Sequence, residues 1–429
     1  MEFLNYYIDE SYTPSDSDLI ALFRVEASKS VPFREAVAKV ASESSNGTWT
    51  ELTTMKPYII KLCAKAFYIK KPWVKIAYPL ELFEEGNMSQ ILSSIAGNIF
   101  GMKAVRKLRL EDVYWPIEII KWFKGPKYGI NGVRDILKVY DRPILASVPK
   151  PKVGLTTDEF TEVAYEIWKG GVDLVKDDEN LTSLSFNRFE ERVKKMLRLR
   201  DKVENETGER KGYLVNISAP YREMIKRAKL VSELGGEFVM VDILTVGWSA
   251  LQSLRDELED LGLAIHAHRA FHAAFTRDPR HGMSMKVVAE ISRIIGVDHI
   301  HVGTVVGKLE AKRVEVETLI RICREDGSSE NMKLKFLKKN WNGLKPILPV
   351  SSGGLHPGLI PDIIRLFGKD LIIQVGGGVA GHPDGLYAGA KAFRDSVEAT
   401  LEGIPLEDKA RESIELKHAL EHWGYLHPI

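Results

Sequence analysis

Cysteine is scarce in this chain of 429 residues, which contains only Cys63 and Cys323. Two cysteines cannot build a disulfide framework, and they lack the spacing of a zinc site, so a reducing cytoplasm fits the composition. No apolar run approaches the length of about 20 residues that spans a membrane, and the N-terminal MEFLNYYIDE lacks the pattern of a signal peptide. The formal net charge of +1 argues against a nucleic-acid or polybasic membrane surface. We therefore expect a soluble cytoplasmic protein that binds neither nucleic acid nor membrane.

The sequence also lacks internal repeats, low-complexity segments and a Gly-x-Gly-x-x-Gly motif after its first barrel-like strand, which disfavours a doubly wound dinucleotide-binding sheet. From about residue 142 onward it has eight short apolar runs that alternate with longer amphipathic stretches. The runs are ILASVP (144–149), VDLV (172–175), YLVNIS (213–218), FVMVDIL (238–244), LAIHAH (263–268), HIHV (299–302), ILPVS (347–351) and LIIQV (371–375). Strands that are apolar throughout predict a parallel sheet covered on both faces. Eight strand–helix units predict a (β/α)₈ TIM barrel, whose active site lies at the C-terminal ends of the strands.

The N-terminal third follows a different pattern, which predicts an α+β module of ferredoxin-like size. We expect strands at 19–27 and 73–80 and within 103–115, and helices at 32–45 and from residue 88. The Gly- and Pro-containing segment 123–143 is interpreted as a connector. The sequence thus predicts an α+β N-terminal domain at 1–135, followed by a catalytic barrel with a C-terminal helical extension at 136–429.

The most informative motif is the charged run Lys176-Asp177-Asp178-Glu179, which ends the second predicted barrel strand. Burying unpaired charges is costly, so a compensating ligand is expected there. Mg²⁺ is such a ligand because it takes carboxylate oxygens, and a neutral lysine amine can add carbon dioxide to become a further oxygen ligand, a carbamate. Taken alone, the run fits a salt-bridged acidic loop equally well. We expect Asp177 to face away from the others and to pair with a cation.

Polar residues collect at six of the eight predicted strand ends, where a barrel would place its site. Besides the acidic run they are Lys150, Lys152, His266, His268, Arg269, His299, His301, Ser351, Ser352, Gly353, Gly354, Gln374, Gly376, Gly377 and Gly378. The Gly-rich ends of strands seven and eight offer backbone N–H groups to a phosphate, although a Gly pair is usually only a turn. Arg269 and His301 are candidates for a second phosphate, and Lys150 and Lys152 for proton transfer.

Several of these residues also have simpler explanations. Because side chains alternate along a strand, we expect that the pairs His266/His268 and His299/His301 cannot all face one way. We therefore interpret His266 and His299 as packing residues. His272, His281 and His356 are interpreted as helix or loop residues. Lys308, in the loop after strand six, is either a solvated residue or part of a catalytic lid.

Long motifs across this chain resemble those of one family. They are GGVDLVKDDEN (170–180), KPKVGL (150–155), HAHRAFHAAF, DHIHVGTVVGKLE, SSGG, QVGGG, ESSNGTWT (43–50) and AGNIFGMKAVRKLRLED (96–112). Along nearly its whole length the chain resembles the large subunit of ribulose-1,5-bisphosphate carboxylase/oxygenase (RuBisCO), and most of all the archaeal type III form, which needs no small subunit. The resemblance implies a carbon–carbon lyase that converts ribulose-1,5-bisphosphate and carbon dioxide to two 3-phosphoglycerates, with oxygen as a competing substrate, in AMP and nucleoside breakdown.

The resemblance also implies a role for each matching residue. Mg²⁺ would be held by carbamylated Lys176, Asp178 and Glu179, and the carbamate would take the proton from carbon 3 to form an enediolate. Lys150 would assist proton transfer, His268 would serve hydration and cleavage, and Lys308 would close over the site. The residues implied in substrate binding are Thr48, Trp49, Asn98, Lys152, Arg269, His301, Lys308, Ser352, Gly353, Gly354, Gln374, Val375, Gly376 and Gly377.

Four implied site residues, Glu43, Thr48, Trp49 and Asn98, lie far from the barrel in sequence. In the family such residues come from the neighbouring subunit, so the resemblance implies a homodimer at minimum, and a pentamer of dimers, a decamer, also fits. The chain departs from plant-type enzymes at Val148 and Val175, where threonine is usual. Two alternatives stay open: a RuBisCO-like enolase or isomerase for a (thio)sugar phosphate, and a non-catalytic binding scaffold.

Overall fold

The computed structural model describes residues 2–306 and 312–425, so Lys308 lies outside the described residues. The chain folds as two compact units. The first comprises 1–124, 271–295 and 325–344, and the second comprises 125–270, 296–324 and 345–429. No helix in the described ranges is long and apolar enough to cross a membrane.

The first unit is built on a five-stranded sheet with the order β10-β4-β1-β3-β2. Its strands are β1 (Leu19–Ala27), β2 (Lys65–Lys70), β3 (Trp73–Tyr78), β4 (Val105–Tyr114) and β10 (Gly282–Met283). Its helices include α1 (Phe33–Glu43) and α3 (Met88–Ile95). The chain order β1-α1-β2-β3-α3-β4 with the antiparallel sheet order 4-1-3-2 is the ferredoxin-like arrangement predicted from the sequence. The edge strand β2 was not predicted, because KAFYIK alternates only weakly between apolar and polar residues.

The remaining elements of the first unit are short, apart from one fully buried helix. They are η1 (Glu2–Tyr7), α2 (Pro57–Ile60), η2 (Leu80–Leu82), η3 (Asn98–Gly101), α4 (Ile117–Lys121), α11 (Ala273–Thr276), α12 (Met285–Ile295), β12 (Gly327–Ser328) and β13 (Lys339–Asn340). A buried ion cluster joins two of these segments, α12 and β13, to β4. Lys339 Nζ lies 2.9 Å from Asp112 Oδ1 and 2.8 Å from Glu290 Oε1, and Trp115 Nε1 donates to Glu290 Oε2 at 3.0 Å. Burial and the neighbouring Asp112 raise the pKa of Glu290 well above its usual value, although the Lys339 ammonium opposes that effect.

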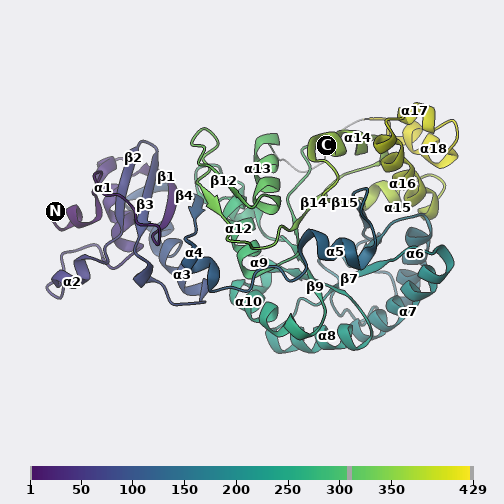
Figure 1. The fold of residues 1–429 in the computed structure, drawn as a ribbon, viewed down its shortest axis with the longest axis horizontal. Coiled ribbons are helices and arrows are strands. Elements are labelled where there is room, and N and C mark those ends of the chain that lie inside the picture. The colour runs from purple at the N-terminus through teal and green to yellow at the C-terminus, as the bar shows by residue number, and fades with distance from the viewer. Residues whose placement is uncertain (1, 307–311, 426–429) are drawn as a thin grey trace. The chain divides into compact units, whose positions relative to one another are not determined.

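The second unit is a closed barrel of eight parallel strands in the order β11-β14-β15-β5-β6-β7-β8-β9 (Figure 1), which confirms the predicted TIM barrel. The strands are β5 (Ile144–Ser147), β6 (Leu174–Lys176), β7 (Gly212–Asn216), β8 (Phe238–Asp242), β9 (Ala264–His268), β11 (His299–His301), β14 (Leu348–Ser352) and β15 (Ile372–Gln374). All eight lie within the predicted apolar runs or overlap them.

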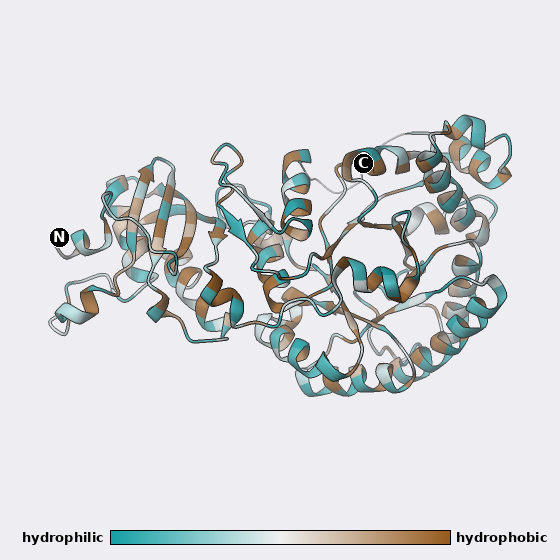
Figure 2. Ribbon diagram, viewed as in Figure 1, coloured by the Kyte–Doolittle hydropathy of each residue, from teal (hydrophilic) through white to brown (hydrophobic). Residues whose placement is uncertain are grey.

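Amphipathic helices follow the strands, and Figure 2 shows hydrophobic colour along the strands and hydrophilic colour on the outer turns of α7 and α8. The helices of this unit are α5 (Gly129–Leu137), α6 (Thr157–Lys169), α7 (Phe189–Thr207), α8 (Tyr221–Glu233), α9 (Ile243–Val246), α10 (Trp248–Glu257), η4 (Leu258–Asp260), α13 (Arg313–Arg324), η5 (Pro357–Leu359), α14 (Ile360–Phe367), α15 (Gly377–Ala380), α16 (Leu386–Glu402), α17 (Leu406–Lys409) and α18 (Ile414–Trp423). Helix α6 begins with a capping box between Thr156 and Glu159.

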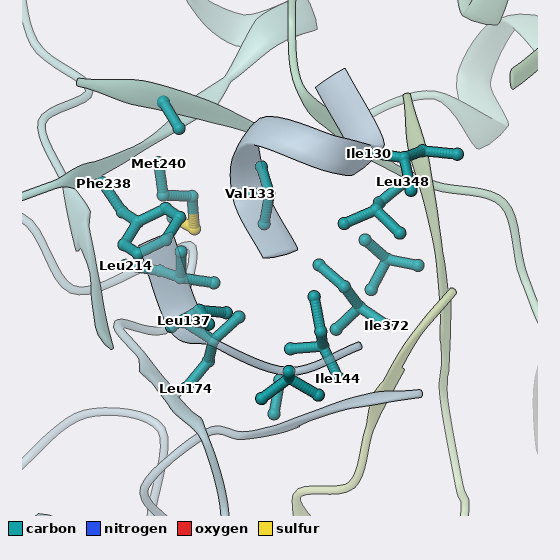
Figure 3. Close-up of a cluster of buried hydrophobic side chains, with 14 residues drawn as sticks. Ile130, Val133, Leu137, Ile144, Leu174, Leu214, Phe238, Met240, Leu348 and Ile372 are labelled. Atoms are coloured by element: carbon teal, nitrogen blue, oxygen red, sulfur yellow. The ribbon is translucent and has the colours of Figure 1, made fainter. Parts of the chain in front are cut away.

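Helix α5 closes the N-terminal end of the barrel. Its Ile130, Val133 and Leu137 pack among side chains from the starts of the strands, such as Ile144 and Ile372 (Figure 3). The interpretation of 123–143 as a plain connector is therefore wrong in part. The Gly and Pro residues of the segment suggested a loop, but the apolar spacing i, i+3, i+7 of these three residues builds a helix against the barrel core. With this end filled, the opposite rim is left for chemistry.

Candidate active site

The polar strand ends face the barrel interior because they continue the alternation of the core. Leu174 packs in the interior core, so Lys176, two residues later on β6, points the same way. The same parity carries the polar side chains at the ends of β7, β8, β9, β14 and β15 inward. It also corrects one expectation: His266 and His268 are two residues apart, so they share a face rather than opposing each other, as do His299 and His301.

Lys176 and Asp178 are both buried, with side chains that reach different partners. Lys176 Nζ donates to the carbonyl oxygen of Asp177 at 2.7 Å. Burial lowers the pKa of Lys176, although the carboxylates of Glu179 and Asp178 oppose that effect. Asp178 Oδ2 accepts from Lys150 Nζ at 2.9 Å, and Oδ1 accepts from the Asn180 backbone at 3.2 Å. Burial raises the pKa of Asp178, but these hydrogen bonds outweigh it and the pKa lies below its usual value.

Asp177 points away from this group, as the sequence predicted. Its carboxylate lies 3.2 Å from Arg192 Nη2 of α7, and both side chains are fully buried. It also accepts from the Tyr213 hydroxyl and from the Asn216 backbone N–H at 2.9 Å. Asp177 therefore anchors the strand end behind the two neighbouring residues rather than joining them.

Two further polar residues, Asn216 at the end of β7 and Asp242 at the end of β8, belong to this rim and were not singled out from the sequence. Asn216 Nδ2 donates to the carbonyl oxygens of Asp178 and Glu179, at 3.2 Å in each case. Asp242 Oδ1 lies 3.0 Å from His268 Nδ1, and His268 Nε2 lies 3.6 Å from Glu179 Oε2. Both lie inside predicted strands at inward positions, but each is the last residue of its strand only in the structure, so the sequence did not mark it as a strand end.

A buried chain of histidines lies beneath the rim. His266 Nδ1 is 3.2 Å from His299 Nδ1, and His266 Nε2 is 2.8 Å from His301 Nε2. His301 Nδ1 is in turn 2.8 Å from the Ser352 hydroxyl. Burial lowers the pKa of all three histidines, that of His299 to about 3, so the rings are neutral. His266 and His299 pack below the rim, and the two ring nitrogens of His301 are occupied by His266 and Ser352.

The glycine-rich ends of β14 and β15 form the opposite side of the rim. Gly353 and Gly354 have φ angles of 113° and 74°, a left-handed region that favours glycine. A Cβ on Gly376 would lie 3.2 Å from Lys150 Cε, whereas one on Gly377 would meet open space. Gln374, beside Ser352 in register, has a buried Oε1 with no hydrogen-bond partner among the described residues. The backbone at Gly377 is therefore accessible, close in sequence to the Gln374 amide oxygen, which lacks a hydrogen-bond donor among the described residues.

The two other predicted cationic residues of the barrel differ in setting. Arg269 directly follows β9, and within the described ranges its guanidinium makes no hydrogen bond or ion pair. Burial lowers the pKa of Arg269 to about 10, so it keeps its charge at neutral pH. Lys152 is exposed beyond the end of β5. An unpaired, partly buried guanidinium is suited to an anionic ligand.

The remaining predicted residues belong to the first unit. Glu43 ends α1, and Thr48 and Trp49 lie in the following turn, where Trp49 is 79% exposed. Asn98 begins η3 and is exposed. Such exposure of a tryptophan is unusual in an isolated chain, because indole rings are normally well buried.

The residues at the rim fit a magnesium ion only if Lys176 is modified. Among the described residues, no group of three or more His, Cys, Asp or Glu side chains could hold a metal ion. Asp178 and Glu179 supply two carboxylates, and a carbamate on the adjacent lysine would supply the third anionic ligand. The donor set is then entirely oxygen, which suits a hard cation.

Comparison with known proteins identifies the family. The model of the ribulose bisphosphate carboxylase large chain catalytic domain matches residues 129–423, and that of its N-terminal domain matches residues 6–119. The chain belongs to the RuBisCO large-chain family. The ribulose bisphosphate carboxylase of Pyrococcus furiosus is 54% identical to it over 426 residues, covering 98% of each chain.

Solved structures of archaeal RuBisCO enzymes agree in fold along the whole chain. The dimeric RuBisCO of Hyperthermus butylicus superposes with a TM-score of 0.94 at 52% identity, covering 99% of this chain and 100% of the other. The octameric RuBisCO of Pyrococcus horikoshii, in complex with sulfate, gives 0.92 at 51% identity, with 98% and 97% coverage. The family resemblance deduced from the sequence motifs is thus confirmed.

Proposed function

We propose that this protein is a ribulose-1,5-bisphosphate carboxylase/oxygenase of the archaeal type III form, which yields two 3-phosphoglycerates in nucleoside monophosphate breakdown. One observation carries the proposal: Lys176 is buried beside Asp178 and Glu179 at the rim of a barrel that is similar, along its whole length, to archaeal carboxylases. The chain also retains the polar residues at the rim that a carboxylase would use, which disfavours both the enolase alternative and the non-catalytic scaffold.

Carbamylated Lys176, Asp178 and Glu179 would hold Mg²⁺. When bound, Mg²⁺ supplies positive charge that stabilises negative charge developing on the substrate oxygens. The lysine must first lose its proton, because only the neutral amine attacks carbon dioxide; the new N–C bond forms as the nitrogen releases a second proton. Burial, which lowers the pKa of Lys176, favours that neutral amine.

Proton transfer would be performed by the carbamate and by two basic side chains at the rim, Lys150 and His268. The carbamate on Lys176 would accept the carbon 3 proton of the bisphosphate. Lys150, which compensates the charge of Asp178 at 2.9 Å, would later donate a proton to the cleaved product. His268 would serve hydration and cleavage, with Asp242 at 3.0 Å setting the orientation of its ring. Lys308 is proposed, from the family resemblance alone, to close over the site.

The two ends of the substrate would be held on opposite sides of the rim. Arg269, charged and without a protein partner in the described residues, would bind one phosphate. The family resemblance implies His301 there too, but its ring is neutral and contacts His266 and Ser352 through both nitrogens, so Arg269 would supply the charge. The backbone N–H groups around Gly353, Gly354, Gly376 and Gly377 would bind the other phosphate. Ser352 and Gln374 would contact the sugar chain that lies between the two phosphates. Val375 and Lys152 would also line the substrate-binding site.

The smallest active unit would be a homodimer without a small subunit. The exposure of Trp49 and Asn98 supports this proposal, because a neighbouring subunit would bury both side chains. With Glu43 and Thr48 they would complete the neighbour's site. A decamer remains a prediction for the larger assembly.

Labelled bicarbonate tests the proposal directly. The protein is incubated with Mg²⁺, labelled bicarbonate and ribulose-1,5-bisphosphate, and label is counted in acid-stable 3-phosphoglycerate. Label in that product supports the carboxylase. Exchange of the carbon 3 proton without fixation would instead indicate the RuBisCO-like enolase.

A further inference from the structure

The last helix of the described chain ends against the two glycine-rich loops. Trp423, the final residue of α18, stacks on His356 with ring centroids 5.8 Å apart and an interplanar angle of 23°. It meets His382 edge-on at 6.2 Å and 64°. His356 follows the Gly353-Gly354 pair after β14, and His382 follows α15, which begins at Gly377. One indole ring therefore contacts both segments that lead out of the proposed phosphate site.

The segments behind the site approach so closely that glycine is required at two contacts, and a third glycine lies at ordinary contact distance from Trp423. A Cβ on Gly378 would lie 2.3 Å from the carbonyl oxygen of Leu355, which joins the loop after β15 to the loop after β14. A Cβ on Gly358 would lie 2.0 Å from the carbonyl oxygen of Gly424, and one on Gly381 would lie 3.5 Å from Trp423 Cζ2. The two loops and the end of α18 thus form a single packed assembly, in which a shift of one part displaces the others.

Helix α18 has anchors of its own that do not involve the loops. Its Leu416 and Ala419 pack in an apolar cluster with residues of α16 and α17. Ser413 caps the helix by accepting from the Leu416 backbone N–H at 3.1 Å, and its hydroxyl donates to Asp395 of α16 at 2.6 Å. Because these contacts fix helix α18 independently of the loops, they hold the Trp423 ring, here called the wedge, in one position against both loops.

We propose that Trp423 is a positioning residue that sets the spacing of the two glycine loops, and thereby the affinity of the site for one phosphate of the substrate. This inference rests on the proposed function, since it assigns the phosphate to those loops. Backbone N–H groups can bind a phosphate together only when both loops are held at the matching separation. The wedge would act on binding rather than on bond making, because Lys176 and His268 lie on strands other than β14 and β15.

The kinetic test compares Trp423→Ala with two reference variants. Trp423→Ala is expected to raise KM for ribulose-1,5-bisphosphate about tenfold and to change kcat by less than about threefold, because a sub-ångström loop displacement costs roughly this much. Trp423→Phe keeps an aromatic ring and should restore most of the affinity. Ile414→Ala, at a residue that is 53% exposed on the same helix, should leave both constants unchanged. An unchanged KM in Trp423→Ala, or a fall in kcat alone, would overturn the inference, as would a Phe variant no better than Ala.

A double-mutant cycle measured on bisphosphate affinity locates the effect. Trp423→Ala and Arg269→Ala should reduce affinity by factors that multiply, since they act on opposite phosphates. Trp423→Ala and Gly377→Ala should combine to less than the product, because both act on the same loops. Factors that multiply in both pairs would overturn the assignment to the glycine loops.

Two measurements keep this inference separate from the proposed function and from general unfolding. If the wild-type protein fixes no label, the proposed function fails; inorganic phosphate binding still tests the wedge, with weaker binding expected in Trp423→Ala and equal binding refuting it. Hydrogen exchange at residues 353–356 and 376–382 should accelerate in Trp423→Ala and not in Ile414→Ala. Equal exchange in both variants would contradict a positioning role even if Trp423→Ala were less stable.

Discussion

Replacing Arg192 by methionine would leave Asp177 as a buried carboxylate without its cation. Both side chains are fully buried, and Arg192 also donates to the Tyr213 hydroxyl at 3.0 Å and to the Thr182 carbonyl at 2.7 Å. Removing one partner of a buried pair costs about 3–5 kcal/mol, because the other charge stays desolvated. At about 2 °C per kcal/mol for a domain of this size, Arg192→Met should lower the unfolding temperature by roughly 6–10 °C.

Calorimetry of four proteins tests this reasoning: wild type, Arg192→Met, Asp177→Asn and the double variant. The double variant should be more stable than the sum of the single losses predicts, since it leaves no uncompensated charge. Arg198→Met, at an exposed position of the same helix α7, serves as the matched control and should change the unfolding temperature little. A loss below about 1 kcal/mol in Arg192→Met, or strict additivity in the cycle, would refute the account of Asp177 as a charge held by its ion pair.

Three further outcomes follow from the same structure. Because the folded-state pKa of Glu290 lies above its unfolded value, the wild-type protein should lose stability as pH rises from about 4.5 through that raised pKa. Glu290→Gln should abolish this loss in unfolding measured against pH, and an unchanged profile would argue against the raised pKa. Asp242→Asn should lower kcat by about tenfold to a hundredfold with little change in KM, as the ring of His268 loses its orienting carboxylate; a change in KM alone would speak against that orienting role. Mixing two inactive variants, Trp49→Ala and Lys176→Met, after dissociation and reassembly should restore carboxylation in the hybrid dimer, whereas no recovery would mean that sites are not shared between subunits.

The local pattern of the sequence was sufficient for the eight barrel strands, but not for β2 or for the helix at 129–137. The run VDLV with its charged end could be placed on a strand because apolar period and length are local properties. The outward direction of Asp177 followed from alternation alone. The helix at 129–137 was missed because its Gly and Pro neighbours suggested a loop, and its apolar spacing has meaning only beside a barrel end that needs filling.

Other features depend on contacts between residues far apart in the chain. The pairing of Asp242 with His268, and of Asn216 with the backbone of Asp178, arises because neighbouring parallel strands end at one level of a closed barrel. The contact of Trp423 with two glycine loops likewise joins segments separated by tens of residues.

The sequence by itself determined which chemical groups stand at the strand ends, since strand length and side-chain parity are set by neighbours along the chain. Only the tertiary structure decided which of those groups meet and which are already satisfied. Closure of the barrel buried His301 between His266 and Ser352 while leaving Arg269 without a partner in the described residues. It also buried Lys176, and desolvation, which lowers the pKa of that amine, is a property of the folded surroundings rather than of the sequence.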